Sequence, residues 1–271
     1  MNGHGNDTSA RSPRDNSARS PRDDSSRPPF DVVFLDCDST LSAIEGIDEL
    51  ARDAGVFPQV EQLTREAMDG TSSLESVYGR RLAIVRPTRA AIDALALRYV
   101  ECVVPGADDL IAGLTLLEKR VHLISGGVLE ALLPLAARLG IAEDKVHAVS
   151  LRFDANGAYA GFDEASPLAR SGGKAETCRE VLAQSGHRAA IVGDGKTDLE
   201  ARPPCVAVIG FGGVVAREVM RAGADAWVEG SSILPVLSCL VTPDEVSRLA
   251  SLGPDLAAHV RADAAARGAS R

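Results

Sequence analysis

The chain has 271 residues, of which 45% are hydrophobic, so it is long enough to bury a substantial core. Its 29 basic and 38 acidic residues give a formal net charge of −9, which disfavours nucleic acid as a partner. No apolar run approaches the roughly 18 residues of a membrane-spanning helix, so the sequence predicts no membrane partner either.

Residues 1–29 differ in composition from the rest of the chain. They are rich in Ser, Arg, Asp and Pro, and the segment 9–16 recurs almost unchanged at 17–24. A segment with so few apolar side chains cannot bury a core, so we predict a disordered extension. It lacks the apolar stretch of a secretory signal, and its four Asp argue against an organelle transit peptide, which together favour a cytoplasmic protein.

The first predicted strand, residues 32–35, is apolar throughout and ends in two acids. Such a run is typical of a central strand in a parallel sheet, buried on both faces. Because side chains alternate along a strand, Asp36 and Asp38 can project to the same side at its carboxyl end, where open α/β folds bind their ligands. An Asp-x-Asp pair alone is weak evidence, since a solvated turn can have the same pattern.

Helical patterns replace the strand pattern between this strand and the next. They cover residues 47–54, 59–68, 74–85 and 88–100. An all-helical segment inserted after the first strand predicts a cap, residues 45–100, over the site. The core is then predicted to comprise residues 30–44 and 101–240.

The next strand, residues 121–127, ends in Ser125, Gly126 and Gly127, and a helix is predicted over 128–139. A hydroxyl and free amides at a helix start favour an anion, because those amides lack intrahelical partners and the helix dipole attracts negative charge. The alternative is an ordinary strand-to-helix turn.

Further along the chain, Asn156 and Gly157 predict a hairpin turn within residues 151–162. The sequence Ser-Gly-Gly-Lys at 171–174 then opens a helix predicted to end near Gln184. A lysine at a helix start is mildly unfavourable against the dipole, which suggests another role for Lys174, although an isolated lysine there would usually be solvated.

A short apolar strand from residue 189 ends in Asp194 and Asp198, with Gly193 and Gly195 allowing a tight loop. Acids without a nearby basic partner are costly to gather unless a cation neutralises them, and oxygen ligands suit Mg²⁺. Strands at 206–211 and 226–228 alternate with helices, so the predicted fold is a doubly wound, Rossmann-like parallel α/β sheet. Residues 241–271 are predicted to add a helical extension.

The cysteines and histidines give no sign of a second kind of site. The five cysteines show no Cys-x-x-Cys spacing and fit small buried residues in a reducing cytoplasm, rather than a disulfide or zinc framework. None of the five histidines sits in a ligand-like pair in the sequence, so each is interpreted as structural or superficial.

With these motifs in this order, the chain resembles the haloacid dehalogenase superfamily of phosphohydrolases and, within it, the phosphoserine phosphatase family. The resemblance covers about 31–240, and its motifs are DCDST at 36–40, EGIDEL at 45–50, ISGG at 124–127, YAGFD at 159–163, SGGK at 171–174 and GDG with the following acid at 193–198. The resemblance implies Mg²⁺-dependent hydrolysis of O-phospho-L-serine to L-serine and phosphate, a step of serine biosynthesis, through an aspartyl-phosphate.

The resemblance also implies residue roles. Asp36 is the expected nucleophile, Asp38 the general acid and base, and Lys174 the catalytic cation. The residues expected to bind substrate are Glu45, Met68, Arg81, Ser125, Gly126, Gly127 and Thr197. The residues expected to hold the metal are Asp36, Asp194, Asp198 and, through its backbone carbonyl, Asp38.

Three residues depart from the family pattern: Leu74 stands where phenylalanine is common, Lys196 where a small residue is usual, and Thr197 where some members carry asparagine. The alternatives are a phosphatase or phosphotransferase for another small phosphomonoester, and a non-catalytic, phosphate-sensing relative. The length of the chain and the inserted helices disfavour a receiver-type signalling module. Dehalogenation is disfavoured because that reaction does not require a proton-carrying acid such as Asp38. The sequence does not indicate an oligomeric state.

Overall fold

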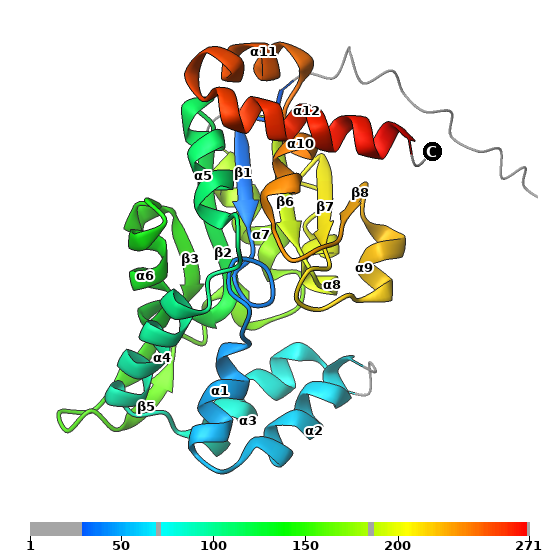
Figure 1. The fold of residues 1–271 in the computed structure, drawn as a ribbon. Helices are drawn as coiled ribbons and strands as arrows, with labels where there is room; N and C mark the ends of the chain where they lie inside the picture. Colours follow the sequence, from blue (N-terminus) through cyan, green and yellow to red (C-terminus); the bar gives the residue numbers. More distant parts are fainter. Residues whose placement is uncertain (1–28, 69–71, 184–186, 270–271) are drawn as a thin grey trace, which may run out of the picture.

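The computed structural model describes residues 29–68, 72–183 and 187–269. The extension predicted over 1–29 therefore lies outside the described residues, apart from Pro29. Six parallel strands form the central sheet in the order β3-β2-β1-β6-β7-β8 (Figure 1). The strands are β1 (Val32–Leu35), β2 (Arg120–Val128), β3 (Val146–Val149), β6 (Ala189–Gly193), β7 (Ala207–Phe211) and β8 (Ala226–Val228). The predicted doubly wound α/β fold is confirmed.

Strand β1 lies at the centre of the sheet, between β2 and β6. All four of its side chains are completely buried, which explains the unbroken apolar run. From β1 the chain builds the sheet outward on one side through β2 and β3. It then crosses back to β6, on the other side of β1, and continues outward to β7 and β8. A crevice forms at such a switch point outside the carboxyl ends of the strands, and Asp36 directly follows β1 there.

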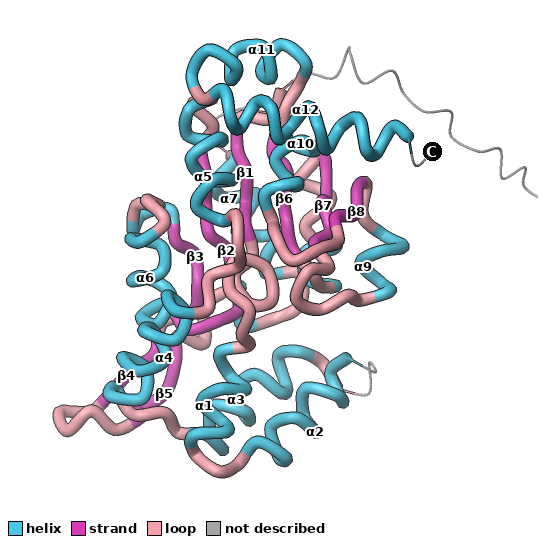
Figure 2. The backbone as a smooth tube through the Cα atoms, in the orientation of Figure 1, coloured by secondary structure: helices cyan, strands magenta, loops and turns pink. Residues whose placement is uncertain are grey.

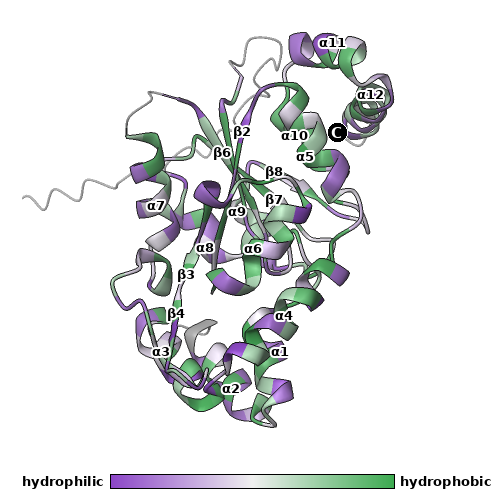
Figure 3. Cartoon of the chain, turned by 90° about the vertical axis from the view of Figure 1, so that its left-hand side faces the viewer, coloured by the Kyte–Doolittle hydropathy of each residue, from purple (hydrophilic) through white to green (hydrophobic). Residues whose placement is uncertain are grey.

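Helices flank the sheet on both sides. Helices α5 (Ala107–Leu116), α10 (Leu237–Leu240) and α12 (Pro254–Ala269) lie on one side and α7 (Gly173–Leu182) on the other (Figure 3). The remaining core helices are α6 (Leu129–Arg138), α8 (Lys196–Glu200), α9 (Glu218–Gly223) and α11 (Pro243–Leu252). The C-terminal segment thus contains two helices, α11 and α12, which pack against each other and bury apolar side chains.

Five helices separate β1 from β2, and the first four have ends within two residues of those expected from the sequence. These four are α1 (Gly46–Asp53), α2 (Phe57–Met68), α3 (Leu74–Val85) and α4 (Arg89–Glu101). Helices α1, α2 and α3, called here the three-helix insertion, lie beyond the carboxyl ends of the sheet strands (Figures 1 and 2). Helix α4 contacts α1 but packs most extensively along α6. It therefore connects the insertion to the core.

The predicted hairpin is present as β4 (Leu151–Phe153) and β5 (Tyr159–Phe162), which pair in antiparallel fashion. Gly157 has a positive φ of 78°, a conformation that favours glycine, so the hairpin turn depends on it. β5 contacts α3, so the hairpin braces the three-helix insertion.

All five cysteines are free thiols, and four of them are buried. Among the helices that the structure describes, none has both the length and the apolar character needed to cross a bilayer.

The tertiary structure brings two histidines together, although the sequence does not pair them. His122 on β2 and His147 on β3 are stacked, with His122 Nδ1 3.0 Å from His147 Nε2. Burial lowers the pKa of both rings, and the charge on His147 contributes to lowering the pKa of His122 to about 4. A hydrogen bond between two ring nitrogens needs one donor and one acceptor, so at least the accepting ring is neutral, and the lowered pKa of each ring favours the neutral form of both.

This pair predicts a loss of stability in acid. The folded-state pKa of His122 lies below its usual 6.5, so between about pH 6.5 and 4 the unfolded chain binds more protons than the folded one. The loss of stability begins as the pH falls below about 6.5 and reaches about 2 kcal/mol near pH 5. We expect the difference in melting temperature between pH 7 and pH 5 to shrink in His122→Asn, measured by calorimetry. If the difference in melting temperature were unchanged in His122→Asn, the histidine pair would not be the cause of the loss of stability in acid.

Candidate active site

A cavity of about 810 Å³ lies where the carboxyl ends of β1, β2 and β6 face the three-helix insertion. Its walls include ten of the residues that the sequence predicted for the site: Asp36, Asp38, Glu45, Arg81, Ser125, Gly126, Gly127, Lys174, Asp194 and Thr197. Asp198 is completely buried next to this cavity, 2.7 Å from Lys174. The side chain of Met68, expected to bind substrate, lies outside what the structure describes.

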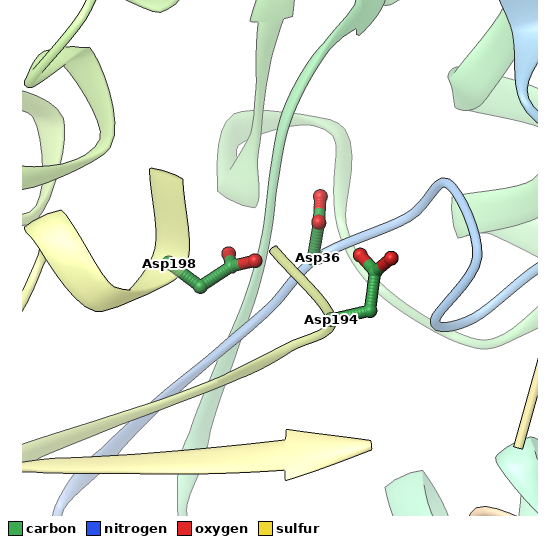
Figure 4. Close-up of side chains that lie close together, drawn as sticks. All are labelled: Asp36, Asp194 and Asp198. Atoms are coloured by element: carbon green, nitrogen blue, oxygen red, sulfur yellow. The ribbon is translucent and has the colours of Figure 1, made fainter. Parts of the chain in front are cut away.

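Three carboxylates cluster at the end of the sheet. Asp36, Asp194 and Asp198 are buried, and an oxygen atom from each lies within 4.8 Å of the others (Figure 4). They come from the ends of β1 and β6 and from α8, so the fold brings acids 36 and 194 together across two adjacent strands. The Asp38 side chain does not belong to this cluster.

The acids do have basic partners, so the assumption that they lack them is wrong. Lys174 Nζ lies 2.8 Å from Asp36 Oδ1 and 2.7 Å from Asp198 Oδ1. Arg217 Nη1 contacts Asp194 Oδ2, and Arg217 Nη2 lies 3.2 Å from Glu45 Oε1. Neither pairing is visible in the sequence, because each joins residues far apart in the chain.

The glycines before Lys174 explain how it reaches the acids. Gly172 has a φ of 72°, and a Cβ on Gly173 would lie 1.8 Å from the backbone oxygen of Pro167. Only glycine fits this close approach, which sets the start of α7. Lys174 is then buried and aimed at Asp36 and Asp198 rather than solvated, and the two carboxylates raise its pKa above the usual range although burial opposes this.

The charges of the cluster fit a divalent cation. Burial, followed by the charge of Asp198, raises the pKa of Asp36 well above its usual range. Burial raises the pKa of Asp194 to about 6, although Arg217 opposes the shift. Three carboxylates outnumber the two cations that touch them, and oxygen donors of this kind suit Mg²⁺. The residues present therefore fit this ion.

Asp38 has a separate environment. Its Oδ1 accepts hydrogen bonds from the Tyr99 hydroxyl at 2.6 Å and from the Gly46 amide at 3.2 Å. Burial, followed by the charge of Glu45, raises the pKa of Asp38 to about 7, while the two hydrogen bonds oppose the shift. A carboxyl group with a pKa near neutral can donate and accept a proton at physiological pH.

The Ser-Gly-Gly segment lies where the sequence predicted it, at the carboxyl end of a strand and directly before a helix. β2 ends one residue later, at Val128, and α6 begins at Leu129. The pairing of β2 with β3 shifts between Ile124 and Val128, which interrupts the regular ladder there. Gly127 N donates to Ser125 Oγ at 2.9 Å, and the Tyr78 hydroxyl of α3 donates to the Gly126 carbonyl at 2.9 Å.

On the insertion side of the cavity, two charged groups face the acids. Glu45 accepts a hydrogen bond from Ser39 Oγ at 2.8 Å as well as from Arg217. Arg81 Nη1 donates to Thr64 Oγ1 at 3.3 Å, but its buried Nε has no partner among the described residues. Arg81 therefore lines the cavity and has a buried donor that no described residue satisfies.

Three further residues of the site, Arg217, Tyr99 and Tyr78, are not predicted from the sequence. Each lies in a stretch without a motif, on or beside a helix, and reads there as an ordinary surface or core residue. Only their contacts with Asp194, Asp38 and Gly126 reveal a part in the site.

Comparison with known proteins gives the same identification. No family model matches the chain. The phosphoserine phosphatase of Bos taurus is 40% identical over 200 residues, covering 73% of this chain and 88% of the relative. The human enzyme is 39% identical over the same length, and the chloroplastic phosphoserine phosphatase of Arabidopsis thaliana is 36% identical over 198 residues, covering 72% of this chain and 67% of the relative.

Solved structures show the same fold. A substrate-bound phosphoserine phosphatase complex superposes with a TM-score of 0.68 at 23% identity, covering 79% of this chain and all of the other. A phosphoserine phosphatase with an analogue of the phospho-aspartyl intermediate superposes with a TM-score of 0.66 at 24% identity, with the same coverage. With its sheet order, its strand-end acids and these relatives, the chain belongs to the phosphoserine phosphatase family of the haloacid dehalogenase superfamily.

Proposed function

We propose that the chain hydrolyses O-phospho-L-serine to L-serine and phosphate. The observation that carries this proposal is the pairing, in one cavity, of the Asp36–Lys174 contact with Arg81, whose Nε has no partner among the described residues. The Asp36–Lys174 pair supplies a nucleophile and a cation for a phosphate, and Arg81 supplies a cation for the carboxylate of an amino acid. The family membership supports the same substrate.

In the proposed reaction, Asp36 attacks phosphorus and forms an aspartyl-phosphate, which splits a slow hydrolysis into two easier steps. Lys174, which touches the Asp36 carboxylate, lies where its charge can also stabilise the phosphoryl oxygens. The Ser125 hydroxyl and the Gly126 amide supply further donors at the wall of the cavity, and the Thr197 hydroxyl supplies another.

Asp38 acts on the leaving oxygen. In its neutral form it gives a proton to the serine oxygen as the bond to phosphorus breaks. The resulting carboxylate then takes a proton from the water that attacks the aspartyl-phosphate. The pKa of about 7 allows both states near neutral pH.

Mg²⁺ would be held by the carboxylates of Asp36 and Asp194 and by the Asp38 carbonyl, with Asp198 next to them. When bound, it offsets the repulsion between an anionic nucleophile and an anionic phosphate.

On the insertion side, Glu45 is proposed to bind the substrate ammonium group and Arg81 its carboxylate, with Met68 as part of an apolar lid. The three-helix insertion is accordingly proposed to act as a cap that selects the substrate. The free cysteines support a cytoplasmic location, and the product suggests a role in serine biosynthesis. The Arabidopsis relative is named as chloroplastic, so other members of the family occupy other compartments.

The substrate assignment predicts that Arg81→Ala impairs only substrates with a carboxylate. A hydrogen bond to a charged group contributes about 1.5–3 kcal/mol, so kcat/KM for phosphoserine should fall by roughly 10- to 150-fold. Phosphoethanolamine, which has the ammonium but lacks the carboxylate, should be nearly unaffected. Glu45→Gln should impair both, and an aryl phosphate should respond little to either change. The measurement is phosphate release with each ester in the presence of Mg²⁺.

Arg80→Ala is the matched control, because Arg80 is the next residue on α3 but is exposed and does not line the cavity. It should leave all three esters unchanged. If Arg81→Ala slowed the three esters equally, Arg81 would bind phosphate or support the fold, and the assignment of an amino-acid substrate would be wrong.

A further inference from the structure

The side chain of Tyr99 is completely buried, and its hydroxyl reaches the active site. Its hydroxyl lies 2.6 Å from Asp38 Oδ1. Burial, followed by the charge of Asp38, raises the pKa of Tyr99 well above its usual range, so the side chain stays a neutral phenol that can donate a hydrogen bond. A buried hydroxyl needs a partner, and Asp38 is the partner here.

The two oxygens of Asp38 have different surroundings. Oδ1 accepts from both the Tyr99 hydroxyl and the Gly46 amide, and the amide can only donate. Oδ2 lies 3.5 Å from the position that a Cβ on Gly127 would take, and Gly127 lines the cavity. No described residue donates a hydrogen bond to Oδ2. One oxygen of the carboxyl group is therefore held by two donors, and the other has no donor and lies beside the cavity wall at Gly127.

We propose that Tyr99 is a positioning residue that fixes the Asp38 carboxyl group so that Oδ2 faces the leaving oxygen of the substrate. The proposal rests on the proposed function, because it assigns Oδ2 as the atom that transfers the proton. Both donors at Oδ1 oppose a proton on that oxygen, so the proton of the neutral acid resides on Oδ2.

Asp38 Oδ2 gives up a proton in the first half-reaction and takes one back in the second. As the bond from an Asp36 oxygen to phosphorus forms and the ester P–O bond breaks, the proton on Asp38 Oδ2 moves to the departing serine oxygen. As water attacks the aspartyl-phosphate, one water proton moves to Oδ2, and the P–O bond to Asp36 breaks with release of phosphate. Tyr99 keeps its own proton throughout.

The fold contains two features that make this contact possible. Gly46 begins α1 directly above the contact, and a Cβ there would lie 2.1 Å from the Tyr99 hydroxyl, so any larger residue would displace the tyrosine. Tyr99 itself comes from α4, which packs along α6 of the core. The tyrosine donor to Asp38 is thus carried by a helix that packs on the core, whereas the second donor, the Gly46 amide, lies at the start of the three-helix insertion.

The test compares esters that differ in their need for an acid. Tyr99→Phe removes only the hydroxyl and keeps the ring. Phosphoserine has a poor alkoxide leaving group that needs a proton, whereas p-nitrophenyl phosphate releases a stable phenolate that does not. We expect kcat/KM, which reports the steps through formation of the phosphoenzyme, to fall at least about 10-fold for phosphoserine and less than about 2-fold for p-nitrophenyl phosphate.

Two further variants separate positioning from a purely structural role. Tyr78→Phe removes the other buried hydroxyl of the site, which bonds to the Gly126 carbonyl and not to Asp38, and should change both esters by the same factor. In an Asp38→Asn background, Tyr99→Phe should cause no additional loss with phosphoserine. Gly46→Ala, which displaces the Tyr99 hydroxyl, should reproduce the ester-selective loss and serves where Tyr99→Phe folds poorly.

An equal loss on both esters, or a loss on phosphoserine that persists in the Asp38→Asn background, would overturn the proposal. Failure of the proposed function would look different, because the unmodified chain would then hydrolyse p-nitrophenyl phosphate but not phosphoserine. In that case the same comparison uses whichever alkyl phosphate the unmodified chain hydrolyses fastest. Its outcome still decides the role of Tyr99.

Discussion

Replacing Asp36 with asparagine is expected to abolish the hydrolysis of every phosphate ester, with a loss of at least about 10⁴-fold, as when a covalent nucleophile is removed. The amide cannot attack phosphorus, and it cannot form the aspartyl-phosphate. The loss should not come from unfolding, because asparagine has nearly the same shape and can still accept the hydrogen bond from the Cys37 amide to Asp36 Oδ1.

Acid quenching during turnover, followed by peptide mapping, should find phosphate on Asp36 alone. Asp31→Asn is the matched control, since Asp31 precedes the same strand at its amino end, away from the cavity, and its variant should keep full activity. Phosphate on any other residue, or substantial turnover by Asp36→Asn, would contradict the assignment of the nucleophile.

The second large effect is expected from Lys174→Met. The lysine is buried and touches both Asp36 and Asp198, so its removal leaves two carboxylates without their shared cation. Removing one partner of a buried ion pair destabilises a protein by about 3–5 kcal/mol, or roughly 10 °C in melting temperature for a chain of this size. Activity should fall by about 10³-fold, because the phosphoryl oxygens also lose a positive charge.

Lys119→Met provides a control with the same substitution at another buried lysine. Lys119 lies at the amino end of β2, where it donates to the Phe30 carbonyl and pairs with Glu245. This variant should also lose stability but keep its kcat at a temperature where it is folded. If Lys174→Met lost no more activity than Lys119→Met, the role of Lys174 would be structural only. Calorimetry and phosphate release measure the two quantities.

The sequence alone determined much of the fold, because the relevant signals are local. An apolar run such as 32–35 specifies a buried strand, and the turn at Gly157 specifies a hairpin, since each depends on neighbouring residues only. Strand-end acids can also be placed in one crevice from sequence, because parallel strands end at the same edge of the sheet. Asp36 and Asp194 meet there for that reason.

Only the tertiary structure decided which charges are paired and which atoms face the cavity. Lys174 neutralises Asp36 and Asp198, Arg217 contacts Asp194, and Tyr99 holds Asp38. A lysine, arginine or tyrosine on a helix has the same local pattern whether it is solvated, packed in the core or aimed at an acid far away in the sequence. Its role depends on the packing of helices against the sheet, and periodicity along the chain carries no information on such long-range contacts.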